Sequence, residues 1–177
     1  MTVAPNRPPL RVLFVCTGNS ARSQMAEAVL NRKGRGRFEA HSAGSHPAAK
    51  VHPLAVEALR EAGLEWGGRL PRGLDGLDRE HWDIVITVCD NARETCPVFP
   101  GQPVVAHWGM PDPAAVEGDE RVRRAAFAEA LALVSRRIDL LLALPFEKVE
   151  RMALEARVRA IGGASGAIAR SPESRSP

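Results

Sequence analysis

Short apolar runs alternate with segments of helical periodicity along most of this chain, and that alternation limits the folds open to it. The runs occupy residues 10–15, 38–41, 84–88 and Val104–His107, and the third of them, IVITV, consists of β-branched residues only. Short apolar runs of this kind are typical of buried parallel strands. The sequence therefore predicts four buried strands.

Helices are predicted between and after these strands, at residues 21–33, 53–62 and 119–144. Each ends beside a glycine or a proline, which commonly stop helices. Residues 65–80 and 89–103 are predicted to be loops. Strands that alternate with helices form right-handed β-α-β units and a parallel sheet, so we expect an α/β fold.

The length of 177 residues fits one domain with an extension at each end. We expect a flexible lead-in at residues 1–9, a catalytic α/β domain at 10–145 and an extension at 146–177. That extension is predicted to hold a short helix at 147–160 and then a disordered tail, because GGASGAIARSPESRSP has too little apolar content to fold. We expect no packed role for it.

Composition and charge argue against several classes of protein. The apolar stretch at 140–144 is far too short to cross a bilayer, and the first ten residues hold no apolar region of a secretory signal. The net charge of +3 comes without a basic stripe interleaved with aromatic residues, which disfavours a nucleic-acid partner. Three cysteines are too few for a disulfide-stapled scaffold. We therefore expect a cytoplasmic monomer with neither membrane nor nucleic acid as a partner.

The loop CTGNSARS, residues 16–23, joins the first predicted strand to the first helix, where ligands bind in open α/β sheets. The start of a helix offers unpaired N–H groups and the positive end of a dipole, both of which attract anions. Gly18 allows a positive φ and Asn19 tolerates one, so successive amides can curl around one centre. Arg22 can hold two oxygens of a tetrahedral oxyanion at once. The predicted oxyanion-binding loop comprises Thr17, Gly18, Asn19, Ser20, Ala21, Arg22 and Ser23.

Cys16 stands at the mouth of this loop and is the candidate nucleophile. The positive field of the helix and of Arg22 is expected to lower the pKa of Cys16, and Ser23 can donate a hydrogen bond to its thiolate. These features predict a reactive sulfur aimed into an anion cradle. The simpler alternative is a buried free cysteine that only ends a strand.

The other two cysteines follow the predicted strand at 84–88. Parallel strands end on the same side of a sheet, so Cys89 should emerge at the same edge as Cys16. Cys96 lies seven residues further on, a spacing longer than a redox Cys-x-x-Cys and poor for a zinc knuckle. A redox role gives all three cysteines one explanation. The alternatives are two cysteines without a role, or a metal site made of Cys89, Cys96, His81 and His107.

The segment VLFVCTGNSARSQMAE, residues 12–27, resembles the low-molecular-weight tyrosine phosphatase superfamily. HSAG at 41–44 matches the second strand of that superfamily. The likeness is greatest to its thioredoxin-coupled arsenate reductases, because the phosphatases usually carry a second cysteine in place of Ala21 and a proline in place of Gln24. HWGMPDPA, residues 107–114, also resembles the reductases closely.

Over residues 10–145 this resemblance implies a doubly wound, four-stranded parallel sheet of strand order 2-1-3-4, flanked by helices. It also implies an arsenate reductase for arsenic detoxification that needs no cofactor. Cys16 attacks arsenate, a transient Cys16–Cys89 disulfide releases arsenite, and Cys96 then moves the disulfide to Cys89–Cys96. An external thiol donor, thioredoxin in that branch, reduces this last disulfide. Asp112 delivers a proton to the oxygen that leaves arsenic.

A metal ion is the one cofactor that this resemblance leaves open. Asn19, Glu27 and Ser42 match positions that support a potassium site in some related reductases. The residues themselves equally allow Asn19 to brace the loop and Glu27 to face solvent. The five histidines show no spacing typical of metal ligands.

Two other functions remain open at this point. A phosphatase acting on a phosphate monoester such as phosphotyrosine needs Cys16, Arg22 and Asp112 but neither Cys89 nor Cys96. A non-enzymatic sensor of oxyanions or of redox state would use the C-terminal extension to bind a partner. Titration of free thiols before and after addition of arsenate separates both from a reductase.

Overall fold

The computed structural model describes residues 7–146 and 151–163 of the chain. Its centre is a four-stranded, all-parallel sheet with the strand order β2-β1-β3-β4. The predicted fold class and strand order are confirmed. The strands are β1 (Leu10–Cys16), β2 (Phe38–Gly44), β3 (Ile84–Thr87) and β4 (Val104–His107).

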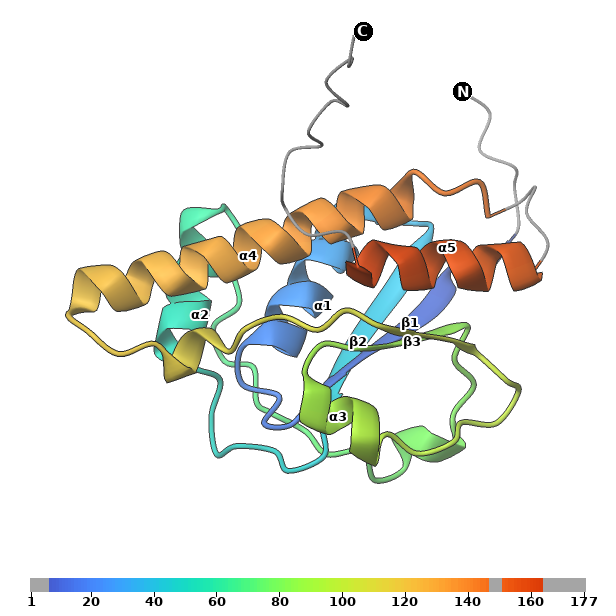
Figure 1. Ribbon diagram of the computed structural model, residues 1–177, viewed down its shortest axis with the longest axis horizontal. Coiled ribbons are helices and arrows are strands. Elements are labelled where there is room, and N and C mark those ends of the chain that lie inside the picture. The colour runs from blue at the N-terminus through green and yellow to red at the C-terminus, as the bar shows by residue number, and fades with distance from the viewer. Residues whose placement is uncertain (1–6, 147–150, 164–177) are drawn as a thin grey trace, which may run out of the picture.

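Helices connect and cover these strands. They are α1 (Arg22–Lys33), α2 (Pro53–Glu61), α3 (Asp90–Thr95), α4 (Glu120–Leu142) and α5 (Arg151–Gly163), with the short 3-10 turns η1 (Leu77–Arg79) and η2 (Pro113–Ala115). α4 contacts α1, α2 and α5, whereas α3 lies apart from them, against β1 and β3 (Figure 1). Within the two described ranges, no helix has both the length and the apolar character that a membrane crossing requires.

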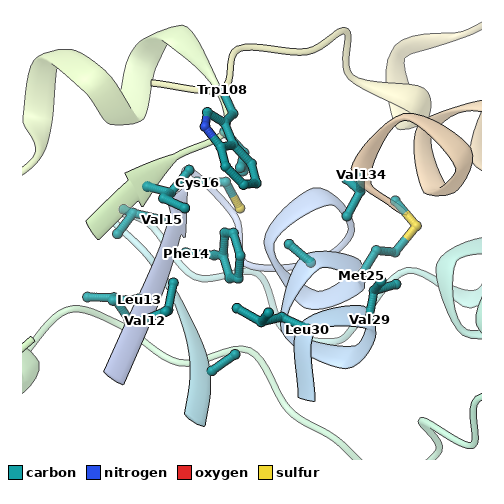
Figure 2. Close-up of a cluster of buried hydrophobic side chains, with 14 of the residues drawn as sticks. Val12, Leu13, Phe14, Val15, Cys16, Met25, Val29, Leu30, Trp108 and Val134 are labelled. Carbon is teal, nitrogen blue, oxygen red and sulfur yellow. The ribbon is translucent and has the colours of Figure 1, made fainter. Parts of the chain in front are cut away.

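The core fills the space between the sheet and the helices α1 and α4. Residues 12–15 of β1 are fully buried, and Met25 of α1 and Val134 of α4 lie on the other side of this space (Figure 2). The rings of Phe14 and Trp108 meet with their centroids 6.0 Å apart. Figure 2 places the sulfur of Cys16 beside these two rings, so the candidate nucleophile belongs to the packed core of the domain.

The strand register brings the carboxyl ends of the strands to one edge of the sheet. Cys16 pairs with Gly44 across β1 and β2, and Thr87 of β3 pairs with Val15 and with His107. The segments that follow β1, β3 and β4 therefore leave the sheet at the same edge. As the sequence predicts, the chain emerges from β3 beside the point at which it emerges from β1.

Two segments differ from the prediction. Residues 89–103 are expected to be a loop, but Asp90–Thr95 form α3. The C-terminal helix expected at 147–160 runs over Arg151–Gly163, and its residues 147–150 lie outside the described part. This helix packs on β4 and buries Val158 completely, because its apolar residues recur at helical spacing. The expectation of no packed role beyond residue 145 is therefore wrong for α5, while residues 1–6 of the lead-in and 164–177 of the tail lie outside the described residues.

Candidate active site

The loop between β1 and α1 is turned so that its N–H groups face inward. Four of its carbonyl oxygens accept hydrogen bonds of 2.8–3.1 Å from backbone N–H groups of the segment 45–52, and they belong to Cys16, Thr17, Gly18 and Ser20. Since the C=O and N–H of a trans peptide point in opposite directions, the amides that follow these carbonyls are directed to the inside of the loop. The N–H of Asn19 has this direction and donates to the sulfur of Cys16 over 3.1 Å. The loop thus has the form of an anion cradle.

Asn19, rather than Gly18, adopts the left-handed backbone conformation that turns this loop. Asn19 has a φ of 48°, whereas Gly18 is not among the residues with positive φ. Gly44 at the end of β2 supplies the necessary room. A Cβ atom there would overlap the backbone of Thr17 and of Asn19, so only glycine fits beneath the loop.

Cys16 is buried beneath the loop, with 3% of its surface exposed. Its sulfur lies 2.8 Å from the hydroxyl oxygen of Ser23, within hydrogen-bond distance. Burial raises the pKa of Cys16, and the hydrogen bonds with Ser23 and Asn19 lower it by less. The prediction of a lowered pKa is wrong, because the loss of water around a buried thiolate outweighs the donors that surround it. The thiol therefore keeps its proton at neutral pH.

Arg22 and Asp112 lie far apart in the sequence and come together beside this loop. The guanidinium of Arg22 lies 3.5 Å from the carboxylate of Asp112 and donates to the carbonyl oxygen of Met110 over 3.2 Å. Asp112 is exposed and begins η2 by accepting a hydrogen bond of 3.0 Å from the N–H of Ala114. The anion-binding side chain and the candidate acid are thus held as a pair.

Cys89 also lies beside the loop. It directly precedes α3, is 5% exposed, and its sulfur is 3.3 Å from the hydroxyl oxygen of Thr17, the residue next to Cys16. The two cysteines are close enough for a charge on Cys89 to raise the pKa of Cys16. Both are free thiols.

Cys96 is placed differently, at the far end of α3. It is a free thiol, and burial raises its pKa to about 11. At the helical rise, α3 separates the Cα atoms of Cys89 and Cys96 by about 10 Å. A disulfide needs Cα atoms less than about 7 Å apart. The structure therefore holds Cys96 beyond disulfide reach of Cys89.

His107 ties the end of β4 to the start of α3. One ring nitrogen lies 2.8 Å from the hydroxyl of Thr87, and the other lies 2.9 Å from the carboxylate of Asp90. Across residues 7–146 and 151–163, no group of three or more His, Cys, Asp or Glu side chains is placed to hold a metal ion. The structure thus does not assemble the alternative metal site of Cys89, Cys96, His81 and His107.

Behind the loop, a chain of buried polar groups runs from Cys16 toward the surface. The amide of Asn19 donates to the hydroxyl oxygens of Ser23 and Ser42, both over 2.9 Å. Ser42 donates to one carboxylate oxygen of Glu27 over 2.5 Å, and the other oxygen pairs with Arg69. Asn19, Glu27 and Ser42 therefore do meet, as a potassium site requires. The guanidinium of Arg69 already neutralises the carboxylate, however, so these residues do not fit a potassium ion.

Residues of the segment 65–72 contact the buried polar groups Asn19 and Glu27 behind the loop. The sequence analysis did not identify this segment as part of the site. The ring of Trp66 lies 4.2 Å from the guanidinium of Arg69, and the backbone N–H of Arg72 donates to the side chain of Asn19 over 2.9 Å. Trp66 and Arg69 occur in a Gly- and Arg-rich stretch that is typical of a loop. Their partners lie far away in the sequence, so no local pattern marks them.

Known proteins share this combination of sequence and fold. Residues 11–155 match the low molecular weight phosphotyrosine protein phosphatase family. An arsenate reductase from Bacillus licheniformis is 37% identical over 127 residues, which are 72% of this chain and 91% of that protein. A thioredoxin-dependent arsenate reductase from Corynebacterium glutamicum superimposes with a TM-score of 0.58 at 33% identity, over 79% of this chain and 62% of that one, so this chain spans under two thirds of it. A low molecular weight protein tyrosine phosphatase from T. tengcongensis superimposes with a TM-score of 0.64 at 26% identity, over 79% of this chain and 99% of that one.

Proposed function

Because this chain belongs to the low molecular weight phosphotyrosine protein phosphatase family, we propose that it is an enzyme of the arsenate-reducing kind found among its relatives. In this proposal Cys16, Cys89 and Cys96 together reduce arsenate to arsenite. The observation that carries it is the contact between the sulfur of Cys89 and the hydroxyl of Thr17, which sets a second thiol beside the nucleophile. A phosphatase needs no thiol there, whereas reduction by thiols needs a second sulfur to form the disulfide.

The first step forms a bond between the sulfur of Cys16 and arsenic. Arsenate binds in the loop 16–23, where inward amides and the fork of Arg22 balance its negative charge. The raised pKa of Cys16 keeps the proton on the thiol until the anion arrives. The bound dianion then takes this proton, and the thiolate attacks arsenic. The carboxylate of Asp112, 3.5 Å from the guanidinium of Arg22, passes this proton on to the leaving oxygen, which departs as water, so the proton of the Cys16 thiol is the one consumed.

The second step moves two electrons to arsenic. The thiolate of Cys89 attacks the sulfur of Cys16, the sulfur–arsenic bond breaks, and its electron pair stays on arsenic. Arsenic passes from the pentavalent to the trivalent state and leaves as arsenite. Cys16 and Cys89 are oxidised to a disulfide, so the electrons balance without another reductant.

The third step moves the disulfide away from the loop. The thiolate of Cys96 attacks the sulfur of Cys89, which frees Cys16 and leaves a Cys89–Cys96 disulfide. Because α3 separates these two residues by about 10 Å, α3 has to unwind for the bond to form. A helix of six residues is far too short to be stable alone, which favours this change. Unwinding also removes the burial that raises the pKa of Cys96.

We further propose that thioredoxin reduces the Cys89–Cys96 disulfide. A relative from C. glutamicum is thioredoxin-dependent, and Val98, which is 96% exposed, offers an apolar contact next to Cys96 for a protein donor. Thiols that must return to the reduced state suit the cytoplasm. We also propose that the protein acts as a monomer, with neither a membrane nor a nucleic acid as a partner. The three cysteines and the thiol donor supply all the electrons, so the proposed reaction needs no other cofactor, and the pairing of Arg69 with Glu27 argues against a potassium ion.

Hydrolysis of phosphate monoesters is the second candidate function. Cys16, Arg22 and Asp112 already form the set that such hydrolysis needs, and phosphate has the same tetrahedral shape and charge as arsenate. The similarity to the phosphatase from T. tengcongensis also favours this activity. It can coexist with arsenate reduction, because both begin at the same sulfur.

The test is a count of thiols and arsenite in the absence of any reductant. The reduced protein is mixed with arsenate, free thiols are titrated, arsenite is measured, and disulfides are mapped under non-reducing conditions. We expect two thiols lost and one arsenite released per chain, with the disulfide between Cys89 and Cys96. Phosphate in place of arsenate is the control and should cost no thiols. A protein that is only a phosphatase or a sensor loses none with either anion, and that result would overturn the proposal.

A further inference from the structure

Arg137 of α4 is a buried cation that bonds only to backbone carbonyls. It is 5% exposed, and its guanidinium donates to the carbonyl oxygens of Trp108 and Gly109, at 2.8 and 3.2 Å, and of Gly162, at 3.2 Å. No carboxylate pairs with it in the part of the chain that the structure describes. A cation buried without a counter-ion is costly. Its presence here indicates a task that an apolar side chain would not perform.

Arg137 joins α5 to the acid-bearing segment, which we define as residues 108–112. A second link repeats this connection, because the indole N–H of Trp108 donates to the carbonyl oxygen of Val158 in α5 over 3.0 Å. The fit between the two elements is tight. A Cβ atom at Gly162 would overlap the carbonyl oxygen of His107, directly before the segment.

The other end of the acid-bearing segment reaches the anion loop. The guanidinium of Arg22 donates a hydrogen bond of 3.2 Å to the carbonyl oxygen of Met110 and lies 3.5 Å from the carboxylate of Asp112. Asp112 lies only three residues beyond Gly109, whose carbonyl Arg137 holds. A shift at the start of the segment is therefore passed to the carboxylate through a short length of backbone.

We propose that α5, acting through Arg137, is a positioning element for Asp112. It holds the acid-bearing segment so that the carboxyl group faces the anion loop when the leaving oxygen needs a proton. The inference rests on the proposed function, since Asp112 has this task only if an oxyanion reacts at Cys16. Arg137 touches no reacting atom and is a positioning residue. The backbone of the anion loop is bonded to the segment 45–52, so the amides that bind arsenate keep their places without α5, whereas Arg22 also contacts the acid-bearing segment.

Neighbouring glycines in α5 provide a matched test. A Cβ atom at Gly162 would collide with His107, whereas a Cβ atom at Gly163 meets nothing within 4 Å. We expect Gly162→Ala to slow arsenite release in a single turnover at saturating arsenate about ten- to a hundredfold, since small misplacements of a reacting group have effects of this size. Gly163→Ala should release arsenite at the wild-type rate. The arsenate concentration that half-protects Cys16 from alkylation should change far less than this rate, because the amides of the anion loop keep their places.

A double-mutant cycle shows whether the effect passes through Asp112. In an Asp112→Asn background, Gly162→Ala should slow the reaction no further, because the acid that it displaces is already gone. Additive effects would mean that α5 acts elsewhere, and they would overturn the inference. Arg137→Lys keeps the charge but not the fork, so it should act in the same direction as Gly162→Ala. If circular dichroism shows that Gly162→Ala does not fold, Arg137→Lys replaces it in the same measurements.

The outcomes separate this inference from the proposed function. If the wild type releases no arsenite, the proposed function fails. If the wild type is active and Asp112→Asn is slow, but Gly162→Ala matches Gly163→Ala, only the positioning role of α5 fails. A wild-type rate of arsenite release in Arg137→Lys would also contradict the positioning role of α5.

Discussion

Two regions bring cysteines to the same edge of the sheet, and they are built in opposite ways. The anion loop 16–23 is bonded on its outer side to the segment 45–52, and Asn19 at its centre is fully buried. The helix α3 has only six residues, exposes most of the side chains of 90–94, and is held at its start by the pair of His107 and Asp90. One region presents a fixed set of donors, and the other is a short helix that has to unwind in the proposed relay.

This contrast matches two different demands of the proposed chemistry. Charge that develops in a transition state is stabilised best by donors that need no rearrangement. Thiol exchange, by contrast, requires each attacking sulfur to move into contact with the sulfur that it attacks and then to move away from it. A structure that is rigid throughout would bind arsenate well but could not pass the disulfide on. Mobility confined to α3 satisfies the second demand without loosening the loop.

Removal of the nucleophile should have the largest effect. We expect Cys16→Ser to lower both arsenate reduction and phosphate ester hydrolysis to background, because both reactions start at this sulfur and a serine hydroxyl is a weak nucleophile. Arsenate should still raise the melting temperature of the variant, since the inward amides and Arg22 remain. Cys89→Ser is the matched variant at the other region and should lose arsenite release but keep the hydrolysis. Arsenite release by Cys16→Ser would remove the loop from the chemistry.

Substitution of Cys96, which directly follows α3, should prevent repeated turnover but not the first reduction of arsenate. We expect Cys96→Ser to release one arsenite per chain and then to halt, even with thioredoxin present. Its disulfide should join Cys16 to Cys89, where the 3% and 5% exposed side chains leave little access for a protein donor. Non-reducing peptide mapping reads this bond directly. Steady turnover of the variant with thioredoxin would show that α3 is not needed for recycling.

The anion-binding arginine should tolerate no substitution by lysine. We expect Arg22→Lys to slow arsenite release roughly a hundredfold, because a donor aimed at developing charge contributes about 3 kcal/mol and lysine lacks the planar fork. Arg93→Lys on the exposed side of α3 is the control and should leave the rate unchanged. Single-turnover measurements with excess arsenate compare the two. A rate within a few-fold of wild type for Arg22→Lys would place the charge stabilisation elsewhere.

The fold could be predicted where the pattern is local. The residues of β3, IVIT, are all buried, so a run of apolar residues is sufficient to locate them. α3 escaped prediction because Asp90–Thr95 shows no apolar periodicity, and only Ala92 is buried among residues 90–94. The existence of a C-terminal helix could be predicted from its apolar spacing. Its packing could not, because its partner β4 is distant in the sequence and carries no matching signal.

The candidate site divides in the same way. Cys16 and Arg22 could be identified because one strand, loop and helix hold all the features that an anion cradle needs. The ion pair of Glu27 with Arg69 and the links of Arg137 join residues far apart in the sequence. The direction of the Cys16 pKa shift was predicted wrongly because burial, its largest cause, depends on the whole fold rather than on the loop residues.

Loss of one hydrogen bond in the loop should have a smaller effect, which depends on pH. Ser23 lowers the pKa of Cys16, whereas burial raises it above the usual value, so Ser23→Ala should raise it further. We expect alkylation of Cys16 to slow about tenfold at a fixed pH near neutrality, as the loss of one such bond predicts, and to recover as the pH rises. Cys96, whose pKa burial raises to about 11, should keep its own profile and serves as the internal control. An unchanged Cys16 profile would mean that Ser23 does not stabilise the thiolate.

A glycine in α3 should have the smallest effect and tests the mobility of this helix directly. Arg93 lies on the exposed side of α3, and glycine in an exposed helix costs about 1 kcal/mol relative to alanine, which raises the unwound population about fivefold. We expect Cys96, which directly follows α3, to react through that unwound state, because burial in the folded segment raises its pKa to about 11. We therefore expect an alkylating reagent to modify Cys96 about fivefold faster in Arg93→Gly than in Arg93→Ala. The alkylation rate of Cys16 should be the same in both variants. Equal acceleration at Cys16 would mean that the loop and α3 open together, and that the fixed cradle and the mobile helix are one unit. No acceleration at either cysteine would mean that α3 does not unwind to expose Cys96, and that the disulfide reaches Cys96 by a different movement of the chain.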